Sequence, residues 1–196
     1  MSTASIRGRI IPFADDAFNT ILADPPWPEF GGGKIRRGAN RHYSLMSVEE
    51  IKALRREVQR VAGANCHLYL WVTNNYLPSG LEVMAAWGFT YKTTVTWVKD
   101  RFGLGQYFRG MSEHLLFGVR GMLPYRTRED GKRAQGVTVI QAPRQEHSQK
   151  PEESARMIEL VSHPPYLEMF ARHPRPGWET WGDQTDTGAV TLPLGL

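Results

Sequence analysis

Apolar and polar residues follow one another in blocks along this chain, and the blocks have two different periods. Residues 19–24, "NTILAD", form a short apolar run bounded by turn residues, which is typical of a buried strand. Residues 47–62 repeat apolar side chains at helical spacing, and Ser47 with Glu50 makes a capping box at their start. The pattern therefore predicts a strand, a connecting segment and then a helix.

The same alternation continues toward the end of the chain. Pro151 followed by acidic residues marks the start of a late helix. Strands that alternate with helices indicate βαβ units, and so a mostly parallel sheet with helices on both faces. Further strands are predicted over residues 66–73, 90–99, 113–121, 137–143 and 166–172, and further helices over 77–88 and 150–162.

Composition agrees with one folded α/β unit. The chain has 196 residues, of which 41% are hydrophobic and 22% charged, and it contains no internal repeat, linker or low-complexity tract. We expect a single domain over residues 1–196, with about eight residues at the N-terminus and about ten at the C-terminus loosely ordered.

Several classes of protein are disfavoured. No apolar run is long enough to cross a membrane, and the first residues lack the apolar core of a signal peptide. The single cysteine, Cys66, excludes an internal disulfide and a thiolate metal cluster, and the six histidines lack close metal-ligand spacing. We expect a cytoplasmic protein with no membrane partner and no metal.

The chemistry lies in the residues that follow the first strand, Asp24, Pro25, Pro26 and Trp27. Two prolines stiffen the segment and remove two N–H donors, so the carbonyl groups and the Asp24 carboxylate form an array of acceptors only. Such an array suits a planar NH₂ group, and Trp27 offers a flat face on which a heterocycle can stack. Because orientation and fixed electrostatics would supply most of the catalysis, the segment indicates methylation of an amino group on a base.

A plainer interpretation is that Asp-Pro-Pro is a turn and that Trp27 belongs to the core. The segment follows a buried strand, however, and precedes the glycine-rich basic stretch "GGGKIRRGANRH". The net charge of +4 tolerates an anionic partner without proving one. Solvated loops account for most basic clusters, such as "YRTREDGKR", but the first cluster adjoins the motif that carries chemistry.

The sequence resembles the DPPW-type adenine-N6 methyltransferases, a permuted class that includes the catalytic subunit of the eukaryotic mRNA adenosine methyltransferase and many bacterial and phage enzymes. The resemblance covers residues 19–184 and rests on "ADPPW", "YSLMSVEEI", "LYLWVTNNYLPSGLEVMAAWGF", "TWVKD", "GLGQYFRGMSEHLLFGVRG", "HSQKPEE", "EMFAR" and "GWETWGDQ" in that order. It implies a Rossmann-like methyltransferase fold, S-adenosylmethionine as cofactor, and a circularly permuted order with the catalytic motif first.

The resemblance also implies roles for individual residues. Asp24 and the Pro25 carbonyl would hold the adenine amine, Trp27 would wall the pocket, and Tyr43 would contact the target base. The cofactor-binding positions are Asp24, Lys150, Arg172, Asp183 and Gln184, with His173 and Arg175 as weaker candidates. The residues expected to hold the nucleic-acid backbone are Lys34, Arg36, Arg37, Arg41 and, in "GLGQYFRG", Arg109.

Each of these residues has a structural alternative. Lys150 could belong to a solvated helix start, Arg172 could end a strand as a surface charge, and Tyr43 could staple onto the following helix. His114 is better explained as a structural histidine than as a base. Asp183 stands where the family usually has Asn, so its contact with the cofactor ribose is less secure. Trp178 and Trp181 are better explained as packing residues.

The leading hypothesis is therefore an S-adenosylmethionine-dependent, adenine-specific DNA methyltransferase that acts on a flipped or unpaired base. DNA is preferred over RNA because the chain has no zinc finger and no RNA-binding module. The alternatives are an RNA adenosine methyltransferase and a catalytically silent nucleic-acid-binding subunit. A protein glutamine methyltransferase ranks last, since that chemistry goes with Asn-Pro-Pro-Tyr. A homodimer or a partner subunit remains open.

Overall fold

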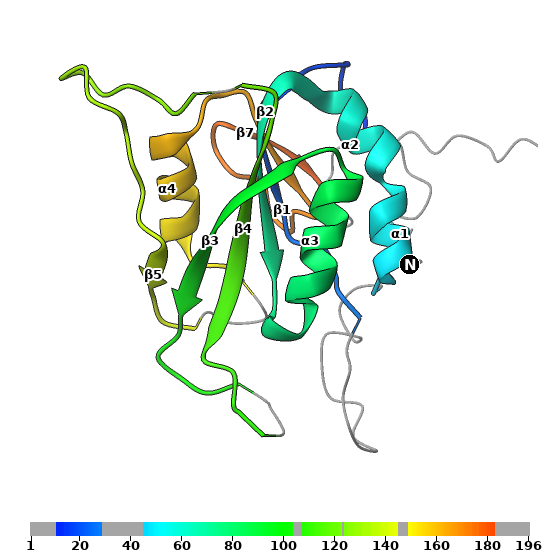
Figure 1. Cartoon of the computed structure of the whole chain (residues 1–196), viewed down its shortest axis with the longest axis vertical. Coiled ribbons are helices and arrows are strands. Elements are labelled where there is room, and N and C mark those ends of the chain that lie inside the picture. Colours follow the sequence, from blue (N-terminus) through cyan, green and yellow to red (C-terminus); the bar gives the residue numbers. More distant parts are fainter. Residues whose placement is uncertain (1–10, 29–44, 104–106, 123, 145–148, 183–196) are drawn as a thin grey trace, which may run out of the picture.

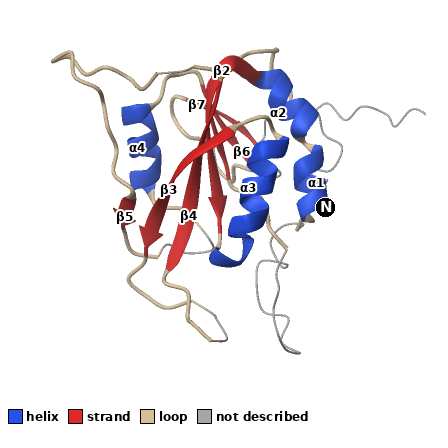
Figure 2. Cartoon of the chain, viewed as in Figure 1, coloured by secondary structure: helices blue, strands red, loops and turns tan. Residues whose placement is uncertain are grey.

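The computed structural model describes residues 11–28, 45–103, 107–122, 124–144 and 149–182. Strands and helices alternate through these residues, as the sequence pattern predicts (Figures 1 and 2). In chain order the elements are β1 (Phe18–Ala23), α1 (Val48–Ala53), α2 (Arg55–Val61), β2 (Ala62–Val72), the 3₁₀ turn η2 (Asn74–Tyr76), α3 (Leu77–Ala86), β3 (Thr90–Val98), β4 (Ser112–Arg120), β5 (Val139–Gln141), α4 (Glu152–Val161), β6 (Tyr166–Met169) and β7 (Trp178–Trp181).

The strands form one sheet in the order β5-β3-β4-β2-β1-β6-β7. Four of its six neighbouring pairs are parallel, because β1 pairs in parallel with β2 and β6, β6 with β7, and β3 with β5, whereas β4 is antiparallel to both β2 and β3. All strands except β4 therefore run the same way. The sheet is mostly parallel, as expected for a Rossmann-like methyltransferase fold, and its carboxyl ends meet along one edge.

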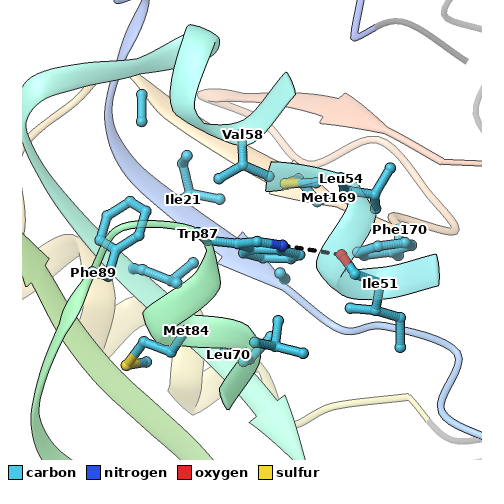
Figure 3. Packing of buried hydrophobic residues seen from close by; sticks show 14 of the residues in the cluster. Ile21, Ile51, Leu54, Val58, Leu70, Met84, Trp87, Phe89, Met169 and Phe170 are labelled. Atoms are coloured by element: carbon cyan, nitrogen blue, oxygen red, sulfur yellow. Dashed lines mark hydrogen bonds between the residues drawn. The ribbon is translucent and has the colours of Figure 1, made fainter. Parts of the chain in front are cut away.

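Helices cover both faces of the sheet, with α1, α2 and α3 on one face and α4 on the other (Figure 2). Alternate residues of β1 serve the two layers, since Ile21 packs with the first set of helices and Leu22 with α4. Within the first layer, the buried Trp87 at the end of α3 donates from its indole Nε1 to the carbonyl of Ile51 in α1, at 3.0 Å (Figure 3). This bond joins α3 to α1 within the helical layer that covers this face of the sheet.

The helix predicted over residues 47–62 begins as expected and is then interrupted. Ser47 accepts a hydrogen bond from the Glu50 amide at 3.2 Å, while the Ser47 amide donates to the Glu50 carboxylate at 2.8 Å, which confirms the capping box. At Leu54 the amide bonds to the carbonyl of Ile51, only three residues back, and α2 starts from there. The second half of the predicted helix is thus a separate element.

The final strand, β7, was not predicted. It follows a segment rich in proline and glycine, and its residues alternate in burial, with Trp178 and Thr180 buried and Glu179 exposed between them. Among the described residues, no helix has the length and apolar character needed to cross a membrane.

Candidate active site

The Asp-Pro-Pro-Trp segment leaves the sheet at the carboxyl end of β1, where β6 and β2 also end. Three backbone hydrogen bonds fix it there. The Asp24 amide donates to the Met169 carbonyl of β6 at 3.4 Å, the Trp27 amide to the Pro25 carbonyl at 2.8 Å, and the Met46 amide to the Pro26 carbonyl at 2.9 Å. The segment therefore turns tightly at Pro26 and is anchored to the residues that precede α1.

Trp27 is largely buried, with 8% of its surface exposed. Its indole Nε1 donates to the Trp71 carbonyl at 2.9 Å, and its ring stacks on Tyr76 with centroids 5.2 Å apart and planes inclined by 19°. One face of the ring is thus occupied by Tyr76, and the indole holds the motif against β2. Trp27 is a packing residue in this structure, and its contact with a substrate base stays a prediction.

The Asp24 carboxylate is bound by Lys150, which lies 126 positions later in the chain. The Lys150 Nζ donates to the two Asp24 oxygens at 2.8 and 2.7 Å. The same ammonium group lies 3.4 Å from a carboxylate oxygen of Glu113 at the start of β4, and Glu113 in turn pairs with Lys99. These four residues, Asp24, Lys150, Glu113 and Lys99, form an alternating row of charges that we call the ion row.

Burial and mutual charge determine the ionisation of the ion row. Burial acts to lower the pKa of Lys150, but the carboxylates of Asp24 and Glu113 outweigh burial, and the pKa is raised above its usual value. Burial likewise acts to raise the pKa of Glu113, but the ammonium groups of Lys150 and Lys99 outweigh it and leave the pKa lowered. Both groups are consequently charged at neutral pH.

Two tryptophans lie beneath the two lysines. The Lys99 ammonium lies 4.6 Å from the Trp97 ring centroid, and the Lys150 ammonium lies 5.6 Å from that of Trp71. The two indoles meet edge to face, with centroids 6.2 Å apart. Cation–π attraction favours charged lysines at these positions and fixes where they can lie.

The remaining candidate cofactor residues differ in their surroundings. Arg172 follows β6, half-buried, and lies close enough to Lys150 that its charge opposes protonation there. His173 is exposed. Arg175 bonds to Glu168 of β6 at 3.0 Å and to Glu152 of α4 at 2.6 Å, so its guanidinium joins two elements of the fold.

Several predicted site residues lie outside the described part of the chain, and their roles stay predictions. They are Tyr43, Asp183 and Gln184, and the basic residues Lys34, Arg36, Arg37 and Arg41.

Glu113 and Lys99 were not predicted as site residues, although both stand in motifs of the resemblance, "GLGQYFRGMSEHLLFGVRG" and "TWVKD". The neighbouring His114 makes two side-chain contacts, with its Nε2 2.5 Å from the Asn74 side-chain oxygen and its Nδ1 3.1 Å from the Thr96 hydroxyl. Burial lowers the pKa of His114. With both ring nitrogens engaged, His114 has the structural role expected of it, whereas Glu113 joins the ion row.

No group of three His, Cys, Asp or Glu side chains suited to a metal ion occurs within the described ranges. The side chains that do converge are the two lysines and two carboxylates of the ion row, beside the acceptor carbonyl groups of Pro25 and Pro26. An array of this kind binds and orients a polar group and stabilises charge, which is what a transfer reaction needs.

A mostly parallel sheet with Asp-Pro-Pro-Trp at the carboxyl end of a central strand is consistent with a Rossmann-like methyltransferase fold. The MT-A70 family model matches residues 18–184. The chain belongs to the MT-A70 family, and it is a methyltransferase of a family that depends on S-adenosylmethionine.

Relatives of two kinds are similar to the chain. A Mycoplasma protein, the type II methyltransferase M.MunI, is 25% identical over 201 residues, which cover 90% of this chain and 81% of that protein. The human N(6)-adenosine-methyltransferase catalytic subunit METTL3 is 29% identical over 86% of this chain, and the mouse N(6)-adenine-specific methyltransferase METTL4 is 29% identical over 85%. The chain spans only 28% and 37% of these two mammalian proteins.

Proposed function

We propose that this chain transfers a methyl group from S-adenosylmethionine to the N6 amine of adenine in DNA, and that it acts on a flipped or unpaired base. The observation that carries the proposal is the Asp24 carboxylate, which stands at the carboxyl edge of the sheet beside two proline carbonyl groups and is held by Lys150. Membership of the MT-A70 family supports methylation at N6 of adenine.

The acceptor array suits the adenine amine for a chemical reason. The lone pair of an aromatic amine is delocalised into the ring, so the amine is a weak nucleophile. When both N–H groups donate to fixed acceptors, the pyramidal form is favoured and the lone pair can attack. The Asp24 carboxylate can accept one bond, and the Pro25 carbonyl, which uses one lone pair for the Trp27 amide, can accept the other.

The charges of the site also suit the cofactor. The amino-acid end of S-adenosylmethionine carries an ammonium and a carboxylate, and the site places an anion, Asp24, beside two cations, Lys150 and Arg172. When bound, S-adenosylmethionine supplies an electrophilic methyl group. We propose that Asp183, Gln184 and His173 contact its ribose.

Asp24 has a second task after the transfer. The methylated amine is cationic and must lose a proton, and the carboxylate that orients it is the group best placed to receive that proton. Lys150 bears on this step because it holds the Asp24 carboxylate in position through two short hydrogen bonds. No stronger base is required.

DNA is proposed as the substrate because the type II methyltransferase M.MunI is matched over the larger share of both chains, 90% of this chain and 81% of that protein, whereas the adenosine methyltransferases are matched over a small part of their length. The 6-amino group of a paired adenine is engaged in the duplex, so the target must be unpaired or extruded. The relatives named for adenosine favour RNA as the second candidate. A partner subunit is a further proposal, suggested by the word subunit in the METTL3 name.

The test is direct. The protein and labelled S-adenosylmethionine are incubated with single-stranded DNA, duplex DNA and RNA of matched sequence in one mixture, which is then digested to nucleosides and analysed by mass spectrometry. N6-methyldeoxyadenosine above N6-methyladenosine supports the proposal. A clear excess of N6-methyladenosine assigns the chain to RNA, and no methylated adenine on any strand overturns it.

A further inference from the structure

The segment that joins β3 to β4 exposes aromatic rings next to the ion row. Residues 99–103 and 107–111 of this β3–β4 loop are described. Tyr107 is 93% exposed, Phe108 91% and Phe102 60%. Burying one such ring is worth about 1.5–3 kcal/mol, so adjacent exposed rings on one loop indicate a surface that another molecule covers.

The loop has a defined structure despite this exposure. The Lys99 amide donates to the Met111 carbonyl at 2.8 Å, which extends the antiparallel pairing of β3 and β4 by one position, and the Gly103 amide donates to the Gly110 carbonyl at 2.6 Å farther out. Arg109 donates from Nε to the Gly103 carbonyl at 3.1 Å. Its guanidinium lies 5.2 Å from the Phe102 ring centroid. The rings are therefore presented from a hydrogen-bonded base.

The loop leaves the sheet directly at the proposed catalytic site. Lys99, at its beginning, pairs with Glu113, just after its end, and Glu113 leads through Lys150 to Asp24. Figure 1 shows the loop projecting from the end of the sheet toward which the arrowheads of β2 and β3 point. A strand whose adenine reaches Asp24 would therefore lie at the same end of the sheet as this loop.

Charge distinguishes the kind of partner. Within the described residues, Arg109 pairs with no carboxylate, whereas Arg101 lies 3.5 Å from Asp100. Flat rings next to an uncompensated guanidinium match the two features of an unpaired nucleic-acid strand, which are the faces of its bases and its phosphates.

We infer that Tyr107 and Phe108 form a stacking platform for the bases that flank the target adenine, with Arg109 on the adjoining phosphate. The inference rests on the proposed function and specifies how the substrate strand is held. Base stacking on an aromatic side chain holds a strand in any sequence, because every base has a flat face.

The experiment measures binding of fluorescent single-stranded oligonucleotides that contain one adenine, by anisotropy at fixed salt. Tyr107→Ala and Phe108→Ala should each raise Kd about 5- to 150-fold, the range that corresponds to loss of one stacked base. Tyr107→Trp should restore the affinity. The matched control is Tyr125→Ala, because Tyr125 is 38% exposed and follows β4, so it lies beyond the end of that strand opposite to the β3–β4 loop.

A second series replaces single nucleotides beside the adenine by abasic ones. If stacking is the interaction, the parent loses affinity at particular abasic positions, and the alanine variants lose no more there, because the partner ring is already gone. If an alanine substitution weakens binding by the same factor on intact and on abasic strands, stacking is refuted. If the alanine variants bind the strand as the parent does but differ from it in oligomeric state by sedimentation, the rings belong to a protein contact and the inference is overturned.

The two proposals can fail separately. If the parent methylates adenine and both alanine variants match it in Kd and kcat/KM, the platform is wrong and the proposed function stands. If the strand and abasic effects appear but no methylated adenine forms, the platform stands and the proposed function is wrong. A parent that binds no single strand overturns the platform.

Discussion

The Asp24–Lys150 pair allows the acceptor array to be tested for activity and stability at once. Asp24→Ala removes both hydrogen bonds that Lys150 donates, at 2.8 and 2.7 Å, and leaves its ammonium with the Glu113 carboxylate at 3.4 Å. Hydrogen bonds to charged groups are worth about 1.5–3 kcal/mol, and an uncompensated buried charge costs more. Because Glu113 still pairs with Lys150, and because the Lys150 and Asp24 side chains are 17% and 26% exposed, we expect Asp24→Ala to lower the unfolding free energy by about 1–2 kcal/mol.

Activity should fall much further. If the carboxylate orients the amine and stabilises charge in the transition state, its removal costs about 10²- to 10³-fold in kcat. S-Adenosylmethionine binding, measured by calorimetry, should weaken at most modestly, since Lys150 and Arg172 remain. The double variant Asp24→Ala/Lys150→Met should recover part of the lost stability, because it removes the ammonium that has lost the closer of its two carboxylate partners, yet it should stay inactive.

The measurements are denaturant unfolding midpoints and single-turnover methylation rates. The matched control is Glu82→Gln, which breaks the 2.6 Å pair between Lys52 and Glu82 on the helical layer, where Glu82 is 61% exposed. The control should change neither midpoint nor rate. If Asp24→Ala retains a rate within a few-fold of the parent, Asp24 does not hold the amine, and the mechanism must be abandoned.

Three further predictions concern charge and packing. The pKa of Glu113 in the folded protein lies below its ordinary value of 4.5, so the stability that its ionised form provides is complete above pH 4.5 and is lost as the pH falls through the pKa of the folded state. In unfolding experiments at a series of acidic pH values, Glu113→Gln should therefore lose less stability with falling pH than the parent does. Gly182→Ala should destabilise the fold by about 1–3 kcal/mol, because the added carbon would lie 2.7 Å from the Ala171 amide nitrogen and collide with the Ala171 carbonyl. In Gly118→Ala the added carbon meets the sulfur of the flexible Met84 side chain instead, so this variant should have a higher unfolding midpoint than Gly182→Ala. Lys34→Ala should weaken DNA binding and lower its log–log salt slope by about one, with kcat at saturating DNA unchanged.

Much of the fold could be predicted because its signals are local. The apolar run before Asp24, the capping box at Ser47 and the proline at the start of α4 each depend on a few neighbouring residues. Strand direction has no such local signal, so the antiparallel course of β4 was not predicted. The strand β7 was missed because its four residues are too few for periodicity to stand out after a proline-rich turn.

The site residues likewise differ in whether a local sequence signal identifies them. Asp24 could be predicted as a site residue because the two prolines and the tryptophan that follow it indicate what a carboxylate would do there. Glu113 could not, because its role depends on Lys150 and Lys99 approaching from other parts of the chain. Lys150 was predicted as a cofactor contact, but its pairing with Asp24 across 126 positions is visible only in the folded protein.

The position of β1 in the sheet has a consequence for the growing polypeptide. β1 is translated first among the strands, yet it lies between β2 and β6, and Thr20 pairs with Tyr166. At about 5–20 residues per second, the edge of β1 that receives β6 waits on the order of ten to thirty seconds for its partner. During that interval an apolar strand edge is open to other chains. The strand that leads into the Asp-Pro-Pro-Trp segment is thus the one that waits longest for its second partner, which makes it a point where protection during translation would matter.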